Sequence, residues 1–388
     1  MKKDVTPVIS VVGPSARFLS GISYYTIRLC NALAEKSTVN AVLFRNMLPK
    51  QLFPGWKRVG KTESSVKFSD AVSVAEVLDW YSPFSWASGA CKIRRSDIVI
   101  FEWWTSSIVH MFLALLLLSG RRTNLVIEFH EVVDPLEYAI LPLRIYARVM
   151  GRIIRKRAYR FVVHSEHDRQ LISSHYRIES SLITVIPHGL YDQYTVMDKE
   201  QCKLKLGLEG KYVLLFFGLL RPYKGVSQLV KAFEKISPSI LEDTVLIVAG
   251  EAWEDQESVD LIKNSQVSDR IVLDNRYISD EDIPVFFSAA DLLVLPYTRA
   301  SQSGVAHIGI AYGLPILATK VGGLVESLGS YKGTRFTEPG DNDGLVLALE
   351  DMITQRSREK YEPPEEMRWD RIAEKYTRDV FTPLQEQR

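Results

Sequence analysis

Short apolar runs recur along the chain, and each is followed by a turn and a helical pattern. In the first half, these runs occupy residues 8–13, 39–44, 97–101, 125–129, 161–163 and 182–186. Continuous apolar runs of this length are typical of strands that are buried on both faces of a parallel sheet. Their alternation with helices predicts a doubly wound α/β sheet.

The same pattern begins again at Tyr212 and predicts a second set of strands. They occupy residues 212–217, 244–249, 270–273, 291–295 and 316–318. We interpret the polar segment 190–211 as a linker. A chain of 388 residues exceeds what one hydrophobic core usually holds, so two domains are expected. We place the first at 1–190 and the second at 191–365, followed by a C-terminal helix at 366–388.

Several segments show the spacing of apolar residues that is typical of helices. Residues 23–36 follow the first strand, and residues 305–312 lie in the second half. Residues 107–118 are apolar on all sides and are therefore expected to be buried. The last helical segment, 368–380, carries apolar side chains on one face. The region 46–90 gives no clear assignment.

Composition and charge exclude few functions. The chain is 46% hydrophobic and 24% charged, which is ordinary for a globular protein. A net charge of +1 gives no sign of nucleic-acid binding, and none is expected. Three widely spaced cysteines indicate a reducing compartment without a disulfide framework. The N-terminus lacks the features of a signal peptide, and the longest apolar run is too short to cross a bilayer. We expect a cytoplasmic protein that is either soluble or bound at a membrane surface.

The segment Y-V-L-L-F-F-G-L-L-R-P-Y-K-G, residues 212–225, carries the clearest candidate chemistry. Arg221 and Lys224 lie where a predicted parallel strand ends and a helix begins. Ligands of open α/β sheets bind at that edge. A guanidinium and an ammonium suit a diphosphate, because Arg chelates phosphate oxygens and Lys adds a point charge. The alternative is a solvated loop with ordinary surface charges.

Four further residues form a second candidate anion site. Ser301, Gln302, Ser303 and Gly304 precede a predicted helix, whose first amides are free to bind phosphate. A simple serine cap is the alternative, and the two interpretations are compatible because they use the same amides. No metal ligand set is evident in the sequence, and His164 is interpreted as part of a strand-end turn.

Three single residues complete the set of candidates. Glu326 is a carboxylate that could reach a nucleotide, or else a surface helix residue. Gly21 lies in the first loop, where it either lets the backbone approach a ligand or only starts a helix. His130 follows an apolar strand and is either a site residue or a buried structural histidine.

In their order along the chain, these motifs resemble the retaining glycosyltransferases of family four. The segments that carry the resemblance are S-G-I-S-Y-Y-T, V-I-P-H-G, F-G-L-L-R-P-Y-K-G, A-A-D-L-L-V-L-P-Y, S-Q-S-G-V and G-L-P-I-L-A-T-K-V-G-G. The resemblance implies the GT-B fold, in which two Rossmann-like domains face a central cleft and the C-terminal helix crosses back to the first domain. It also implies a nucleotide-diphospho-sugar donor on the second domain and an acceptor on the first.

The resemblance assigns roles to three of the candidates. Arg221 and Lys224 would neutralise the departing diphosphate, so that no divalent metal and no other cofactor is needed. His130 would contact the donor sugar and support the reaction centre. We expect front-face attack with the leaving phosphate as base, because nothing in the sequence singles out a carboxylate nucleophile.

The chain departs from the family pattern in one place. The family carries two glutamates, eight positions apart, in the donor-site signature. The corresponding positions here hold Ala300 and Ile308, which cannot accept a hydrogen bond from a sugar or ribose hydroxyl. Either a neighbouring polar residue contacts the sugar, as in a subfamily without the glutamate pair, or donor binding is weak or lost.

The segment 143–157 bears on location and acceptor. Its basic residues are expected on one helical face and its apolar residues on another. A basic amphipathic helix can lie on anionic lipid. The alternative is a core-packed helix with a solvated charged face. If the membrane contact is real, the acceptor is lipid-linked or part of a cell-surface glycan.

The resemblance therefore implies a retaining hexosyltransferase, and we expect it to act in cell-surface polysaccharide or glycoconjugate synthesis. A sugar-nucleotide epimerase can share the architecture, although the Arg221–Lys224 turn favours transfer. A non-catalytic subunit that binds nucleotide sugars is the other alternative, because the glutamate pair is missing. The base, the sugar and the acceptor are left open by the sequence.

Overall fold

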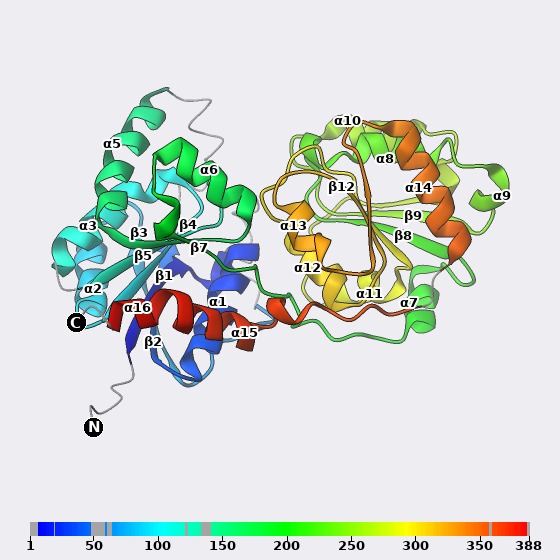
Figure 1. The fold of residues 1–388 in the computed structure, drawn as a ribbon. Coiled ribbons are helices and arrows are strands. Elements are labelled where there is room, and N and C mark those ends of the chain that lie inside the picture. The colour runs from blue at the N-terminus through cyan, green and yellow to red at the C-terminus, as the bar shows by residue number, and fades with distance from the viewer. Residues whose placement is uncertain are drawn as a thin grey trace. The chain divides into compact units, whose positions relative to one another are not determined.

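The protein divides into two compact units in a computed structural model. Unit 1 comprises Met1–Gly189 with Glu366–Arg388, and unit 2 comprises Leu190–Glu365. Because the placement of one unit on the other is not determined, each is described by itself (Figure 1). The structure describes residues 7–18, 20–47, 59, 64–120, 123–132, 141–356 and 359–385.

Unit 1 is built on a parallel sheet of seven strands in the order β3-β2-β1-β4-β5-β6-β7. The strands are β1 (Val8–Pro14), β2 (Thr38–Asn46), β3 (Val72–Asp79), β4 (Ile98–Trp103), β5 (Asn124–Phe129), β6 (Ala158–Val163) and β7 (Ile183–Val185). The predicted strands of this half are thus present, and β3 is an additional one. Only its ends are buried and residues 73–77 are exposed or half-buried, because β3 is an edge strand.

Helices cover both faces of this sheet. They are α1 (Gly21–Ala34), α2 (Pro83–Ile93), α3 (Val109–Ser119), α5 (Leu141–Arg157), α6 (Glu166–Tyr176), α15 (Trp369–Lys375) and α16 (Thr382–Gln385), and a π-helical segment, Tyr376–Phe381, joins the last two. Side chains of α3, α5 and α6 share one core with the sheet. On the opposite face, α1 shares a core with α15 and the π-helical segment.

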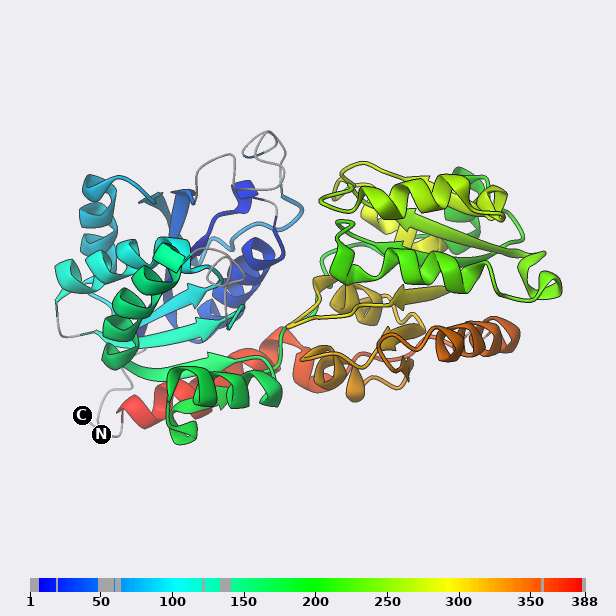
Figure 2. The same cartoon turned by 90° about the horizontal axis from the view of Figure 1, so that it is seen from above.

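The C-terminal segment therefore belongs to the core of unit 1, although it is last in the sequence. Trp369, Ile372 and Tyr376 are buried beside Tyr25 and Leu29 of α1. The red C-terminal helices lie against unit 1 in both Figure 1 and Figure 2. The apolar face that the sequence predicted for this segment packs here because it completes the layer that α1 begins.

One expectation about the helices of unit 1 was met only in part. The segment 107–118 was expected to be buried, and Val109, Phe112 and Leu115 are buried. In the structure, Leu117 is 74% exposed and Leu118 is 53% exposed, both in α3. Apolar residues all around a helix do not ensure burial on all sides, because only one side of α3 packs on the sheet.

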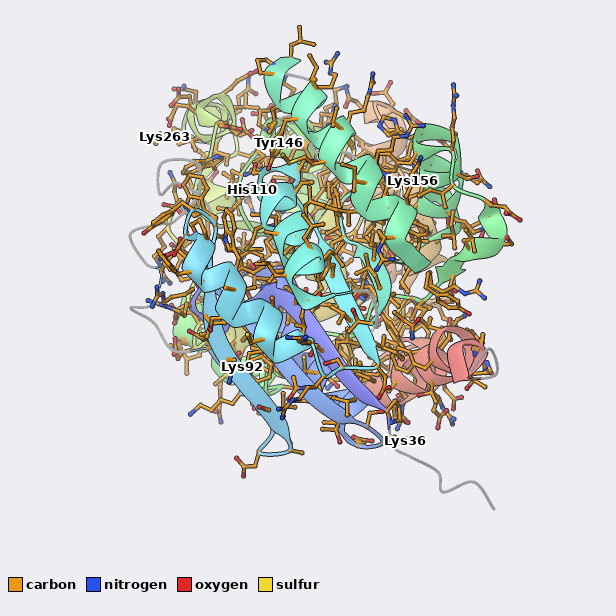
Figure 3. The ribbon with its side chains drawn as sticks, turned by 90° about the vertical axis from the view of Figure 1, so that its left-hand side faces the viewer. Lys36, Lys92, His110, Tyr146, Lys156 and Lys263 are labelled. Carbon is orange, nitrogen blue, oxygen red and sulfur yellow. The ribbon has the colours of Figure 1, made fainter. Side chains whose placement is uncertain are left out.

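Helix α5 also differs from its prediction. Tyr146, Met150 and Ile154 pack on the core, whereas Val149 and Ile153 are exposed beside arginines. The hydroxyl of Tyr146 also lies 2.5 Å from Nδ1 of His110 in α3, which ties these two helices together; both residues are labelled in Figure 3. The basic face and the apolar face predicted for 143–157 are therefore not cleanly separated. The apolar residues extend around the helix beyond the side that packs on the core.

Unit 2 repeats the architecture with six parallel strands in the order β10-β9-β8-β11-β12-β13. They are β8 (Tyr212–Phe217), β9 (Thr244–Ala249), β10 (Ile271–Asp274), β11 (Leu292–Leu295), β12 (Ile316–Thr319) and β13 (Thr334–Thr337). The strand β13 is at an edge and has one buried residue in four, so it contains no continuous apolar run that would predict it. The other five strands confirm the prediction.

The helices of unit 2 enclose its sheet, with α8 and α10 drawn above it and α7, α11 and α12 below it in Figure 1. Their bounds are α7 (Lys199–Leu206), α8 (Val226–Phe233), α9 (Pro238–Leu241), α10 (Gln256–Asn264), α11 (Ile283–Ala289), α12 (Gly304–Ala311), α13 (Leu324–Gly329) and α14 (Asn342–Gln355). The segment 190–211, interpreted as a linker, contains α7. Its Cys202 is buried against Val285 and Ala289 of α11, so this segment is part of the unit.

Both sheets have the strand order of dinucleotide-binding folds, in which the order reverses between the first and fourth strands. Ligands of such sheets bind outside the carboxyl ends of the strands at that reversal. In unit 2 the reversal lies between β8 and β11, and in unit 1 between β1 and β4. Among the described residues, no helix has the length and apolar character needed to cross a bilayer.

Candidate active site

The turn after β8 holds the two cations that the sequence singled out. Arg221 directly precedes a helical turn, Pro222–Lys224, and Gly225 follows it with φ of 70°. A Cβ at Gly225 would lie 2.0 Å from the carbonyl oxygen of Pro296, which follows β11. Only glycine fits that close approach and that backbone angle. The glycine therefore fixes the turn against the loop after the neighbouring strand.

Further contacts hold the loops after β8, β11 and β12 together. The backbone N–H of Thr298 donates to the carbonyl oxygen of Tyr223 at 2.8 Å. In the loop after β12, Gly322 has φ of 45°, and a Cβ there would meet the carbonyl oxygen of Ala300 at 1.9 Å. Three loops thus converge at the carboxyl edge of the sheet, at the place where a ligand is expected.

Lys224 is held inside this set of loops. Its Nζ lies 5.3 Å from the ring centroid of the buried Tyr297. Burial lowers the pKa of Lys224, the positive charge of Arg221 lowers it further, and Tyr223 acts in the opposite direction. Lys224 is half-buried, and an ammonium partly removed from water without a carboxylate beside it is destabilised; a bound anion would offset that cost.

Two polar groups beside these loops have no partner within the described residues. The buried Nε–H of Arg221 donates no hydrogen bond, and the side-chain amide of Gln302 is unpaired at both its oxygen and its nitrogen. Buried polar groups are nearly always satisfied in native proteins, so unpaired ones at a strand edge indicate a missing ligand or ordered water.

The serine-rich segment leads into α12. The Oγ atom of Ser303 accepts a hydrogen bond from the N–H of Ala306 at 3.3 Å and therefore caps the helix. It also lies 3.4 Å from the hydroxyl of Tyr297, which connects the cap to Lys224. Ser301, Gln302 and Gly304 are half-buried. Both interpretations of the sequence, a cap and an anion site, are compatible with this arrangement.

Three other positions in unit 2 bear on the prediction. Ala300 contributes only its backbone to the approach of Gly322, and Ile308 is buried in α12. The positions of the missing glutamate pair are therefore apolar in the fold as well. Glu326 is exposed in the first turn of α13, which is compatible with both of its interpretations.

The candidates of unit 1 lie at the carboxyl edge of its own sheet. Gly21 is exposed and begins α1, which Ser20 caps. His130 follows β5, and its ring lies 4.9 Å from that of His164 and 4.7 Å from that of Tyr25 between centroids. Burial, followed by the neighbouring His164 and His188, holds the pKa of His130 well below its usual value. His130 is therefore a neutral imidazole.

A buried carboxylate lies beside these histidines. Oε1 of Glu128 accepts hydrogen bonds from the hydroxyls of Tyr25 and Tyr376, both at 2.5 Å. Glu102 of the adjacent strand β4 pairs in register with Glu128 and accepts a hydrogen bond from Thr26 at 2.5 Å. Burial raises the pKa of both carboxyl groups, to about 7 for Glu128.

Sequence reasoning missed the buried glutamates, His164 and His188 as members of one cluster. The signal was present in the alternation of the strands. Each of the positions 102, 128, 164 and 188 lies two residues after a side chain that packs in the core shared with α1. Those core residues are Ile100, Val126 and Val162 in strands and Ile186 directly after β7. Recognising it requires the strand order, because the four positions are far apart in the sequence.

Family models match both units. The model of the glycosyl transferases group 1 matches residues 198–375, and that of glycosyltransferase family 4 matches residues 19–193. Together, the two matches cover most of the chain, in the order that the sequence motifs predicted.

Curated relatives match at moderate identity. The chain is 25% identical over 277 residues to mannosylfructose-phosphate synthase of Agrobacterium fabrum, a match that covers 68% of this chain and 58% of the relative. It is 26% identical over 248 residues to D-inositol 3-phosphate glycosyltransferase of an Arthrobacter species, covering 63% and 54%. The chain thus matches somewhat more than half the length of these relatives.

Solved structures agree with the fold. The protein HepE of Anabaena, crystallised with UDP and glucose, superposes with a TM-score of 0.67 at 18% identity, covering 98% of each chain. This similarity supports the two-domain GT-B architecture that the sequence predicted. The two family models, which together cover most of the chain, show that it belongs to the family-four glycosyltransferases.

Proposed function

We propose that this protein transfers a sugar from a nucleotide-diphospho-sugar donor to a glycan or lipid-linked acceptor, with retention at the anomeric carbon. The donor binds to unit 2 and the acceptor to unit 1. The observation that carries the proposal is the turn after β8, in which Arg221 and Lys224, both half-buried, lack carboxylate partners among the described residues. Two cations at the carboxyl edge of the sheet suit a diphosphate.

The same turn lowers the activation barrier of the reaction. As the sugar leaves, negative charge grows on the diphosphate, and the two cations stabilise that charge more than they stabilise the bound donor. Donor binding then needs no divalent metal. The unpaired amide of Gln302, or the hydroxyls of Ser301 and Ser303, take the place of the missing glutamates as contacts to the sugar or ribose. Gly304 and the first amides of α12 bind phosphate.

His130 is the proposed catalytic residue of unit 1. Its neutral ring suits a hydrogen bond to a sugar hydroxyl, because one ring nitrogen donates and the other accepts. Gly21 and the start of α1 contribute backbone amides. The attacking hydroxyl loses its proton to the leaving phosphate, so the protein supplies no carboxylate nucleophile.

A binding experiment tests the donor site. The melting temperature of the protein is measured with UDP, GDP, ADP, dTDP and their glucose conjugates, because a ligand that binds only the native state raises its apparent stability. One diphosphate is expected to stabilise the protein, and Arg221→Ala is expected to remove most of that shift. The exposed Lys263 of unit 2 offers a control, since Lys263→Ala should leave the shift unchanged. An equal shift in the Arg221 variant would overturn the proposed site.

A second function is motivated by the apolar side chains of Ala300 and Ile308. In that case the protein binds nucleotide sugars without catalysing transfer. The two functions differ in one readout: a transferase slowly hydrolyses its donor in the absence of acceptor, whereas a binding subunit leaves the donor intact. The anomeric coupling constant of a transfer product, measured by NMR, would test retention.

We further propose that unit 1 contacts the cytoplasmic face of an anionic membrane through α5. Leu141, Ile145, Val149 and Ile153 form an exposed stripe four residues apart. The exposed basic residues Arg148, Arg152, Lys156 and Arg157 lie on the same side, and α5 contains no acidic residue. Apolar area combined with one-signed positive charge favours an anionic lipid surface over another protein.

The neighbouring helices extend this surface. Leu117 and Leu118 are exposed on α3, which packs against α5. Figure 3 shows α2, α3 and α5 side by side on one face of unit 1, with Lys92 and Lys156 labelled on the outer helices. A transferase held at a membrane in this way would act on a lipid-linked acceptor, such as an intermediate of cell-surface polysaccharide or glycoconjugate synthesis.

A further inference from the structure

The carboxyl ends of β5 and β6 bring three potential metal ligands together. Glu128 pairs in register with Val162, so His130 and His164, each two residues further along, lie side by side. One ligand atom from each of Glu128, His130 and His164 lies within 4.8 Å of the others. Two histidines and one carboxylate are a common ligand set of zinc and iron sites in proteins.

The ring of His164 is oriented as a metal-binding histidine is. Its Nδ1 atom lies 3.1 Å from the carbonyl oxygen of Ile186. Because a carbonyl oxygen only accepts, Nδ1 carries the ring proton and Nε2 presents a lone pair. That Nε2 atom is buried, has no hydrogen-bond partner in the described structure, and lies 3.7 Å from Oε1 of Glu128. A backbone carbonyl on the far nitrogen is the usual second partner of ligating histidines.

The other two groups also direct unused atoms to this place. Nε2 of His130 and Oε2 of Glu128 are buried without a hydrogen-bond partner within the described residues. Neither Glu128 nor the adjacent Glu102 pairs with a lysine or arginine there. Two buried carboxyl groups in neighbouring strands thus lack a compensating cation, although burial makes an unpaired carboxylate expensive.

We propose that Glu128, His130 and His164 bind one divalent transition-metal ion, of the class to which Zn²⁺ belongs. The ion would accept the lone pairs that face one another across the cluster and would neutralise the buried carboxylate. Ligand atoms around a tetrahedral zinc lie roughly 3.4 Å apart, so side-chain rotations that move each ligand atom by about an ångström would bring all three to zinc-binding distance. Oε2 of Glu128 would bind the ion, while Tyr25 and Tyr376 hold Oε1 in place through their hydrogen bonds.

A shared proton is the alternative, and it accounts for less of the geometry. One proton on Glu128 or on a ring nitrogen would satisfy a single pair of atoms. The shortest nitrogen–oxygen separation between Glu128 and His164, 3.7 Å, is too long for a hydrogen bond. Three acceptors directed to one region match one multivalent cation better than one proton.

The ion would bind in unit 1, whereas Arg221 and Lys224 of unit 2 meet the diphosphate without metal. His130 belongs to both proposals: its Nε2 would bind the ion, and its Nδ1–H would donate to the sugar hydroxyl. The ion would fix the ring of His130 and leave a coordination position open toward the edge of the sheet, because His130 is only half-buried. The inference does not rest on the proposed transferase activity, since its test reads metal binding alone.

Untagged protein, stripped with EDTA and dialysed, is titrated with Zn²⁺ by calorimetry, and bound metal is counted by mass spectrometry. One ion per chain is expected to bind. Glu128→Gln and His164→Gln, which preserve approximate size, are each expected to weaken binding at least tenfold. His175→Ala, at an exposed histidine of α6, is the matched control and should bind as the unchanged protein does.

Co²⁺ provides a second readout. Bound at nitrogen and oxygen ligands in a four-coordinate site, it should give a visible absorption band that disappears in the His164 variant. Circular dichroism checks the fold, and His130→Gln replaces any variant that unfolds. Absence of binding by the unchanged protein, or equal binding by folded variants of Glu128 and His164, would overturn the proposal. A failed donor-binding experiment would leave this result unaffected.

Discussion

The hydroxyl of Tyr376 donates a hydrogen bond at 2.5 Å to Oε1 of Glu128, although 248 positions separate the two residues in the chain. Tyr376 begins the π-helical segment near the C-terminus, and Glu128 lies in β5 at the centre of unit 1. Both side chains are buried. The last segment of the chain therefore contributes a polar contact, in addition to apolar packing, to the cluster that contains His130.

Removing that hydroxyl should destabilise unit 1. Tyr376→Phe keeps the ring in the core but leaves the carboxyl group with one donor, Tyr25, instead of two. A hydrogen bond to such a buried group contributes about 1–3 kcal/mol. The free energy of unfolding, measured in urea, should fall by this amount, whereas Tyr81→Phe, at a tyrosine that is 62% exposed, should change little. Equal effects of the two substitutions would contradict the role given to Tyr376.

The close approach at Gly225 can be separated from its backbone angle. Gly225 and Gly210 have φ of 70° and 71°, but a Cβ would meet the carbonyl oxygen of Pro296 at 2.0 Å in the first case and nothing within 4 Å in the second. Gly210→Ala should therefore cost only the backbone term, roughly 1–2 kcal/mol. Gly225→Ala should cost more and should also weaken diphosphate binding, because Arg221 and Lys224 move with the turn. Urea unfolding and calorimetry with the stabilising diphosphate measure the two effects; equal losses of stability would count against the steric argument.

As pH rises, the affinity for a nucleoside diphosphate should begin to fall at a lower pH than it would with a lysine of ordinary pKa. Burial lowers the pKa of Lys224 in the free protein. Below that pKa the ammonium is charged and attracts the diphosphate, and above it the charge is lost, so affinity decreases as pH rises. The ligand is fully ionised above about pH 8 and adds no further change. Binding is measured by calorimetry between pH 7.5 and 10.

A pair of variants assigns this pH dependence to one residue. Lys224→Met should bind weakly at every pH, whereas Lys224→Arg should retain part of the affinity and lose the decline, because arginine stays charged. Tyr297, whose pKa burial raises to about 12, does not titrate in this range. A decline that persists in the arginine variant would show that another group is responsible.

Binding to anionic vesicles should depend on the basic residues of α5. Replacing Arg148, Arg152 and Lys156 by Gln removes about 1 kcal/mol of attraction each, so the partition coefficient should fall roughly 100-fold on vesicles that contain phosphatidylserine. Replacing the exposed Lys205, Lys235 and Lys263 of unit 2 changes the net charge equally and should have little effect. Sedimentation with vesicles measures both, and similar losses in both triple variants would indicate nonspecific attraction.

Much of the fold follows from local sequence pattern. The run Tyr212–Phe217 is apolar at every position and is a strand with these bounds, since such a segment is stable only between two helical layers. Edge strands such as β3 and β13 escaped prediction because their exposed faces remove the continuous apolar signal. In the same way, the cation turn after β8 could be found from Arg221 and Lys224, because the strand, the turn and the helix are contiguous in the sequence.

The sequence by itself determined the two sheets, the cation turn and the apolar face of the C-terminal helix, because each depends on residues close together in the chain. Only the tertiary structure decided that Glu128, His130, His164 and Tyr376 meet. That meeting depends on the order of parallel strands and on the register between them, neither of which a run of apolar residues encodes. The exposed leucines of α3 were decided in the same way, because burial depends on which side of a helix the sheet covers.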